Sequence, residues 1–305
     1  MIEWNIPVHI IHPFISMSDR LGLFPHKSVS TTVWDLEDDK CVGVLEGHSP
    51  HVASAEINDA GDAAVIIAGP PGSTYVASIW NLGTMQCTAN LTSTGQLSSL
   101  LRDRLLLGSR DDATIKLWDI GGTAPVALFD LRADAPSNRV NSIWSLTASD
   151  TSSVALTGYF RTPAHLWDLR TGQRVRLLQG HTWAVTAVSM DSACRTAVTG
   201  SWDKTVKLWD LGSGRCMDTY HFGPEVKYVM MHESGGSFLV VGEELVFKAW
   251  TTALGSSSSP IYDVDLSSSS KSECEPTVVA SRDLSRVGIC CQNPEGNRLE
   301  VSVWK

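Results

Sequence analysis

Three residues between positions 180 and 210 carry the side-chain types of a hydrolytic triad. His181 supplies an imidazole, Thr199 a hydroxyl and Asp203 a carboxylate, and Trp209 follows shortly after them. In a hydrolase such a set activates the hydroxyl as a nucleophile, and a substrate and an oxyanion hole must both reach that hydroxyl. The same side chains also form buried hydrogen-bond networks without catalytic function. The elements that position them therefore have to be established first.

Four short strands position these residues. Runs of alternating apolar residues and of small and β-branched residues indicate strands, and residues typical of turns separate the last three runs. The pattern predicts strands at residues 174–178, 185–188, 196–200 and 206–209. Short links between them favour hairpins, so the four strands form one antiparallel sheet. Such a sheet cannot bury its faces alone and must pack against similar sheets.

The unit recurs along the chain. A tryptophan closes the third strand of each copy, at Trp34, Trp80, Trp118, Trp167, Trp209, Trp250 and Trp304. The pairs Gly180-His181 and Trp209-Asp210 resemble the signature of the WD-repeat (WD40) family of β-propellers, and Gly47-His48 with Trp80-Asn81 gives a near-complete second copy. This resemblance implies an all-β fold, a seven-bladed β-propeller of four-stranded antiparallel blades. We expect one domain over residues 1–305.

The resemblance also gives the triad-like residues a structural role. In WD-repeat proteins the residues matching His181, Thr199, Asp203 and Trp209 form a hydrogen-bond relay inside the blade, in which Asp orients His, His bonds Thr, and the Thr hydroxyl bonds the indole N–H. A threonine buried in this way has no path for a substrate and no oxyanion hole. We therefore expect no catalytic residue and no enzyme activity.

Ring closure depends on the N-terminus. Counting back from Trp34 without a gap places the strands of the first repeat at residues 8–11, 21–24 and 30–34. In this family an N-terminal strand completes the last blade, and this count leaves only residues 1–4 for it. The sequence thus predicts a weak or incomplete N-terminal closing strand.

Composition excludes several classes of function. The chain has 24 Lys and Arg against 33 Asp and Glu, a net charge of −9, which argues against binding to nucleic acid or to a membrane surface because both need a basic footprint. The seven cysteines do not have metal-ligand spacing, and no glycine-rich phosphate loop opens a helix. We expect no metal and no cofactor, and a location in the cytoplasm or the nucleus.

The remaining candidates for function are large side chains in the loops that enter the innermost strands and in the hairpins between second and third strands. Trp and Arg dominate binding hot spots. Between Arg161 and Arg215 eight Lys and Arg stand against four Asp and Glu, so an acidic or phosphorylated peptide suits this region. The predicted partner-binding residues are Arg110, Arg139, Tyr159, Phe160, Arg161, Trp183, Trp202, Lys204, Lys227 and Tyr228.

The leading functional hypothesis is a non-enzymatic scaffold that binds protein or peptide partners on the propeller face. An alternative is the substrate-recognition propeller of a ubiquitin ligase, because the compact third repeat is similar to repeats of F-box WD-repeat proteins, although no F-box helices are present in this sequence. A third hypothesis is a propeller enzyme, which the lack of a converging acid, base and metal set disfavours.

Overall fold

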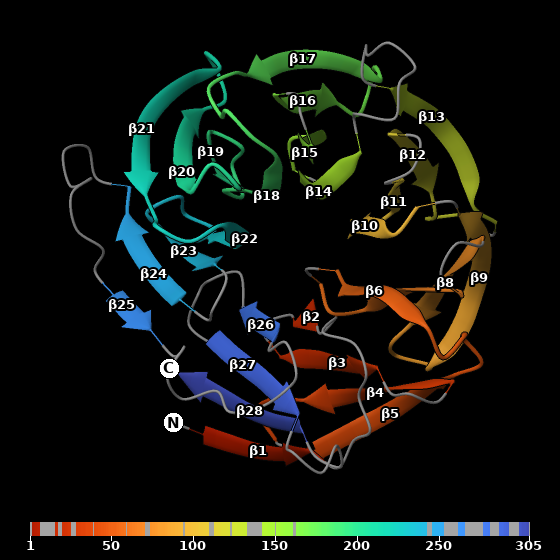
Figure 1. Cartoon of the computed structure of the whole chain (residues 1–305). Helices are drawn as coiled ribbons and strands as arrows, with labels where there is room; N and C mark the ends of the chain where they lie inside the picture. The colour runs from red at the N-terminus through yellow and green to blue at the C-terminus, as the bar shows by residue number, and fades with distance from the viewer. Residues whose placement is uncertain are drawn as a thin grey trace.

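Strands form every regular element that the computed structural model describes. The description covers residues 2–6, 16–17, 20–25, 29–38, 40–58, 60–70, 74–93, 95–109, 113–122, 124–132, 142–149, 151–160, 163–242, 246–252, 262–265, 277–280, 287–292 and 299–304. These strands form seven four-stranded antiparallel sheets, which are arranged as blades around a central axis (Figure 1). The predicted all-β, seven-bladed propeller is confirmed.

The first three blades follow one another along the chain. Blade 1 contains β2 (Ser16–Met17), β3 (Leu21–Pro25), β4 (Ser30–Asp35) and β5 (Lys40–Glu46). Blade 2 contains β6 (Val52–Ile57), β7 (Ala63–Ala68), β8 (Tyr75–Asn81) and β9 (Gln86–Ser93). Blade 3 contains β10 (Leu97–Leu100), β11 (Arg104–Gly108), β12 (Thr114–Asp119) and β13 (Val126–Arg132).

The next three blades repeat this order. Blade 4 contains β14 (Ile143–Ser149), β15 (Val154–Tyr159), β16 (Ala164–Asp168) and β17 (Gln173–Leu178). Blade 5 contains β18 (Val185–Met190), β19 (Thr196–Ser201), β20 (Thr205–Asp210) and β21 (Arg215–His221). Blade 6 contains β22 (Val226–Met231), β23 (Ser237–Gly242), β24 (Val246–Thr251) and β25 (Tyr262–Asp265).

Blade 7 joins the two ends of the chain and corrects the expected weak closure. It contains β26 (Thr277–Ala280), β27 (Val287–Gln292), β28 (Leu299–Trp304) and the N-terminal β1 (Ile2–Ile6), which lies on the outside next to β28 (Figure 1). All five residues of β1 pair with β28, from Ile2 opposite Val303 to Ile6 opposite Leu299. The gapless count went wrong because the innermost strand that pairs with β3 is β2, so more chain is available for closure. Residues 8–11, the expected position of that strand, lie outside the described residues.

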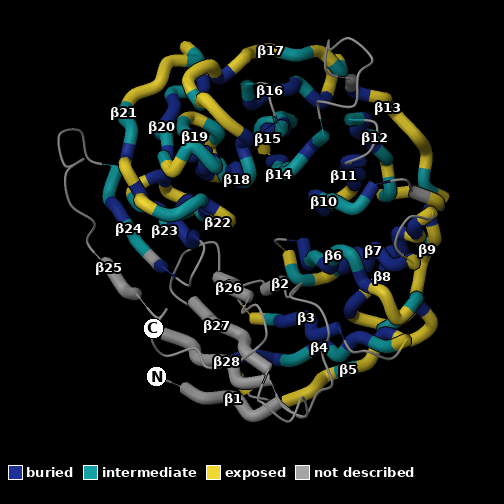
Figure 2. The backbone as a smooth tube through the Cα atoms, viewed as in Figure 1, coloured by how far each residue is buried: buried dark blue, intermediate teal, exposed yellow. Residues whose placement is uncertain are grey.

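The core lies between neighbouring blades. One cluster, for example, joins Val206, Tyr220 and Phe222 of blade 5 to Phe238 and Trp250 of blade 6. Where burial is described in blades 1 to 6, buried residues concentrate in the inner three strands, whereas the outer strands β5, β9, β13, β17 and β21 are largely exposed (Figure 2). Among the residues described, none belongs to a helix long and apolar enough to cross a bilayer.

Each blade has two ends, and we name the faces of the ring after them. The upper face is the side on which the innermost strand of a blade begins and its second strand ends. The lower face is the side on which the innermost strand ends and the third strand turns into the outer strand. Because the strands are antiparallel, a residue's position along its strand fixes the face on which it lies.

Candidate functional site

The triad-like residues form a continuous hydrogen-bond chain inside blade 5. His181 Nδ1 lies 2.8 Å from Asp203 Oδ2, and His181 Nε2 lies 2.8 Å from Thr199 Oγ1. The indole Nε1–H of Trp209 donates to the same Thr199 oxygen at 2.8 Å. With Nδ1–H donating to the carboxylate, Nε2 accepts from the Thr199 hydroxyl, so each of these polar atoms has a partner. The sequence resemblance implied this arrangement.

Asp203 anchors the chain electrostatically. Burial by itself would raise the pKa of this carboxyl, but hydrogen bonds from His181, from the Thr205 hydroxyl and from the Thr182 amide outweigh it and hold the pKa well below its usual range. The distances are 2.8 Å to His181, 2.6 Å to Thr205 Oγ1 and 2.9 Å to the Thr182 nitrogen. A carboxylate held ionised in this way orients the imidazole and fixes its tautomer.

Burial closes the relay to substrates. Thr199 has 0% exposure, and the side chains of His181 and Asp203 are only 2% and 8% exposed. A nucleophile must come within bonding distance of its substrate, and the Thr199 hydroxyl is enclosed by the blade. Among the described residues no group of three or more His, Cys, Asp or Glu side chains is placed to hold a metal ion. This arrangement provides stability and no accessible reactive group.

Other blades keep only parts of the relay. In blade 4 the Trp167 indole donates to Thr157 Oγ1 at 3.0 Å. The buried indole nitrogens of Trp34, Trp80 and Trp118 have no hydrogen-bond partner among the described residues. In those blades the position equivalent to Thr199 is occupied by Phe24, Ile66 and Leu107, which offer no acceptor.

The second Gly-His pair gives a pH-dependent contact. His48, 4% exposed, donates through Nδ1–H to the Ser49 carbonyl at 2.8 Å, so its Nε2 accepts from Thr31 Oγ1 at 2.8 Å. Burial lowers the pKa of His48 below its ordinary value, and the Ser49 carbonyl offsets only part of this effect. Below the ordinary histidine pKa of about 6.5 the unfolded chain therefore binds more protons than the folded chain, and the protein loses stability as the pH falls.

We expect the His48→Gln variant, which cannot titrate at this position, to show a smaller loss of stability than the unmodified protein between about pH 7.5 and about pH 5.5. Urea unfolding at both pH values measures the free energy of unfolding of each protein. Equal losses in the two proteins would contradict a contribution from His48.

Four aromatic side chains gather on the upper face of blades 4 and 5, and we call them the aromatic cluster: Trp144, Phe160, Trp183 and Trp202. The Trp144 and Trp202 rings meet edge to face with their centroids 4.8 Å apart, and Trp144 stacks on Phe160 at 5.8 Å. Phe160 also lies 5.9 Å from Trp202 and 6.2 Å from Trp183. The rings thus support one another, and Trp183 remains 45% exposed.

Equivalent backbone contacts position two of these rings. The Phe160 amide donates to the Ser142 carbonyl at 3.0 Å, and the Trp202 amide donates to the Ala184 carbonyl at 3.0 Å. In each of the two blades, the bond fixes the residue that follows the second strand next to the start of the innermost strand. Each side chain is therefore held at the same height on its blade.

Trp144 was missed by the sequence analysis because it lies within a strand. The pairing of β14 with β15 shifts register between Ile143 and Ser145, so Trp144 is an extra residue in the strand. A bulge of this kind redirects a side chain from the sheet face. The innermost strands β18 and β22 shift at the equivalent positions, at Thr186 and Lys227. The signal available in the sequence was that Trp144 directly follows Ile143, the first apolar residue of the innermost strand.

The other predicted partner-binding residues fall into three groups. Lys204, Lys227 and Tyr228 are exposed on the upper face of blades 5 and 6, with Tyr228 at 46%. Tyr159 is a wrong prediction: its side chain has 0% exposure and packs 4.5 Å from the His165 ring, because it is the last residue of β15 and points into the core between blades 3 and 4. Burial raises its pKa to about 12. Arg110, Arg139 and Arg161 lie outside the described residues.

Comparisons with known proteins agree with this geometry. The model of the family "WD domain, G-beta repeat" matches residues 172–210. Transducin-like enhancer protein 2 of Mus musculus is 25% identical over 186 residues, which is 57% of this chain and 23% of that protein. Eukaryotic translation initiation factor 3 subunit I of Saccharomyces cerevisiae is 35% identical over 78 residues, 26% of this chain and 22% of that protein. The matches thus span less than a quarter of these relatives.

A solved structure resembles the whole ring. A chain in the crystal structure of the mitotic checkpoint complex superposes with a TM-score of 0.77 at 15% identity, covering 97% of this chain and 90% of that chain. The seven four-stranded blades define the class, a β-propeller, which is also the fold of the similar solved structure. Within this propeller, residues 172–210 match the WD-repeat model.

Proposed function

We propose that this propeller is a non-enzymatic scaffold that holds a protein or peptide partner on the upper face of blades 4 to 6. The observation that carries the proposal is the aromatic cluster, in which Trp183 is 45% exposed and lies against Phe160, and Phe160 in turn contacts Trp144 and Trp202. In this proposal residues 1–305 form one interaction domain, and the protein acts in the cytoplasm or the nucleus. Two of the names found in the comparisons are consistent with this role. One relative is named as a subunit of eukaryotic translation initiation factor 3, and the similar solved structure is that of the mitotic checkpoint complex.

The aromatic cluster has the properties of a binding anchor. Tryptophan and tyrosine dominate interface hot spots because they bury a large area with few rotatable bonds. Here ring contacts on either side of Phe160 already restrict the rotamers, so little further entropy is lost on binding. The exposed Tyr228 adds a further aromatic group on the same face.

The neighbouring charge supports an acidic class of partner. Lys204 and Lys227 are exposed on this face, whereas the carboxylate of Asp203 is buried in the relay. An acidic or phosphorylated segment with a bulky apolar residue complements this combination, because the cations attract the charge and the rings contact the apolar side chain. Such a partner binds more weakly at high salt.

A double substitution tests the proposal. Trp183→Ala with Lys204→Glu removes the exposed ring and reverses one charge, and both residues are exposed, so the fold should be retained. Loss of a hot-spot residue costs about 2 kcal/mol or more, so affinity for the partner should fall about thirtyfold. The measurement is quantitative mass spectrometry of proteins captured from a lysate, followed by titration of the recovered partner.

The matched control is Lys40→Glu with Val42→Ala on the outer strand β5. It reverses one exposed charge and trims one exposed apolar side chain away from the upper face of blades 4 to 6. The proposal requires that this control keeps the partners that the first variant loses. Identical recovery by the two variants would refute it.

A further inference from the structure

Three residues of the proposed binding surface lie next to members of the relay. Trp183 is two positions after His181, and Trp202 and Lys204 are the neighbours of Asp203 on either side. These residues belong to two segments of blade 5, the loop that enters β18 and the hairpin between β19 and β20. The relay and the proposed binding surface therefore share the same two segments.

The two carboxylate oxygens of Asp203 hold different segments. Oδ2 lies 2.8 Å from His181 Nδ1 and accepts a hydrogen bond from the Thr182 amide at 2.9 Å, so it holds the loop that carries Trp183. Oδ1 accepts from the Thr205 amide at 3.0 Å and from the Thr205 hydroxyl at 2.6 Å, so it holds the turn of the hairpin. One side chain therefore joins the loop to the hairpin.

A backbone bond joins the same two segments, and blade 4 has its equivalent. The Trp202 amide donates to the Ala184 carbonyl at 3.0 Å. The Phe160 amide donates to the Ser142 carbonyl in the same way. In blade 4, however, the residue after Phe160 is Arg161, and arginine has donors but no acceptor. A carboxylate that joins loop and hairpin is therefore a feature of blade 5 that the sequence of blade 4 does not repeat.

The hairpin turn holds Lys204 in a conformation that favours glycine. Its φ is 67°, in the left-handed region, where a residue with a Cβ is less stable than glycine. The Lys204 amide donates to the Ser201 carbonyl at 3.2 Å, and the Asp203 amide donates to the Ser201 hydroxyl at 3.0 Å. A residue held in an unfavourable conformation points to a function for its side chain. Lys204 is exposed, and its charge is the property that glycine would lack.

We propose that Asp203 is a positioning residue of the upper-face site. It fixes Trp183, Trp202 and Lys204 relative to one another before a partner binds. This inference rests on the proposed function of that face. Anchors that are already ordered lose less conformational entropy on binding than mobile anchors do. The relay thereby contributes to the affinity for a partner, in addition to the stability of blade 5.

Two substitutions remove the link, and one control keeps it. Asp203→Ala removes both acceptor oxygens. Asp203→Ser keeps one oxygen that can bond the turn, as serine does in other turns, but its side chain is shorter than the carboxylate and lacks the second oxygen that holds the loop. The matched control is Thr199→Val, which breaks the relay between His181 and Trp209 but leaves the partners of Asp203 in place.

Fluorine NMR of protein labelled with 5-fluorotryptophan measures the effect on the loop. The Trp183 resonance is identified by its absence from the spectrum of Trp183→Phe. In Asp203→Ala and Asp203→Ser it should narrow and move towards its position in the urea-unfolded protein, because the loop is no longer held. In Thr199→Val it should stay at its original position. Thermal unfolding of each variant gives a temperature at which all of them are folded.

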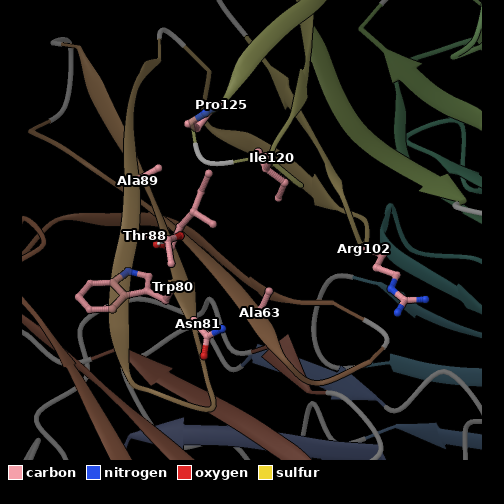
Figure 3. Close-up of a pocket in the computed structure, with 10 residues that line it drawn as sticks. Ala63, Trp80, Asn81, Thr88, Ala89, Arg102, Ile120 and Pro125 are labelled. Atoms are coloured by element: carbon pink, nitrogen blue, oxygen red, sulfur yellow. Dashed lines mark hydrogen bonds between the residues drawn. The ribbon is translucent and has the colours of Figure 1, made fainter.

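Trp80 provides an internal reference for the overall fold. It is buried in blade 2, where it lines a pocket beside blade 3 on the lower face (Figure 3). Its resonance, identified with Trp80→Phe, should not move in any of the three variants. Release of the loop changes the Trp183 signal and not the Trp80 signal, whereas loss of the fold changes both.

Partner binding tests the functional part of the proposal. The affinity for a partner that the unmodified protein captures should fall about tenfold in Asp203→Ala, which corresponds to ordering one or two side chains on binding. In Thr199→Val the affinity should stay within about twofold at the same temperature. Because both substitutions break the relay, this comparison separates positioning from stability.

The outcomes are distinct. A Trp183 resonance that stays in place in folded Asp203→Ala overturns the proposal, and so does an equal change in Thr199→Val, which would show a general loosening of the blade. If Asp203→Ala does not fold, the same criteria apply to Asp203→Ser. Equal partner affinity in the Asp203 variant and in Thr199→Val also overturns it. The NMR measurement needs no partner, so failure to capture one counts against the proposed function and not against the positioning of Trp183.

Discussion

Replacing His181 by alanine is expected to lower the free energy of unfolding by about 2–4 kcal/mol. The imidazole bonds both Asp203 and Thr199 at 2.8 Å inside blade 5. Its removal leaves a buried carboxylate without its main orienting partner and a buried hydroxyl that retains only the Trp209 indole. Loss of one member of a buried network costs the desolvation of the groups that remain. Urea unfolding followed by tryptophan fluorescence gives the value.

The control for this experiment is His51→Ala. His51 is exposed, and its ring is not a member of the relay. A surface substitution of this kind changes stability by no more than about 0.5 kcal/mol. If His181→Ala unfolds at the same urea concentration as His51→Ala, the relay does not stabilise the blade.

Trp209→Phe is expected to cost about 1–3 kcal/mol more than Trp80→Phe, although the two tryptophans occupy equivalent positions. Both are buried, so both substitutions lose a similar packing contribution. The Trp209 indole donates to Thr199, and its removal breaks this bond. The Trp80 indole nitrogen has no partner among the described residues, so phenylalanine there removes a buried polar group that was already unsatisfied.

This comparison uses the chain as its own control, because the amino-acid change, the strand position and the burial are matched. The measurement is the difference between the two free energies of unfolding under identical conditions. A difference near zero, or a greater loss for Trp80→Phe, would show that the hydrogen bond to Thr199 adds nothing to the packing of the indole.

The strands and the relay could be predicted because their signals are local. Alternation of apolar residues and turn formers predicted the strands of blade 5, and these lie at Val185–Met190, Thr196–Ser201 and Thr205–Asp210. The tryptophan that recurs at the end of each third strand predicted the number of blades. A resemblance carried by Gly180-His181 and Trp209-Asp210 implied the contacts of the relay.

Two features required the structure because they depend on register. Trp144 turns to the upper face only because β14 carries an extra residue, and sequence patterns do not reveal a bulge. Tyr159 is the last residue of its strand, where one step along the chain separates a buried side chain from the half-buried Phe160.

The pairing of β1 with β28 makes the formation of the last blade different from the formation of the other six. Blades 1 to 6 each form from consecutive strands, so their pairings close short loops of chain. The last sheet instead joins Ile2 to Val303, and the entropy of closing a loop grows with its length. Pairings that are distant in sequence form slowly. During synthesis β1 must therefore remain with its edge unpaired until β28 has been made.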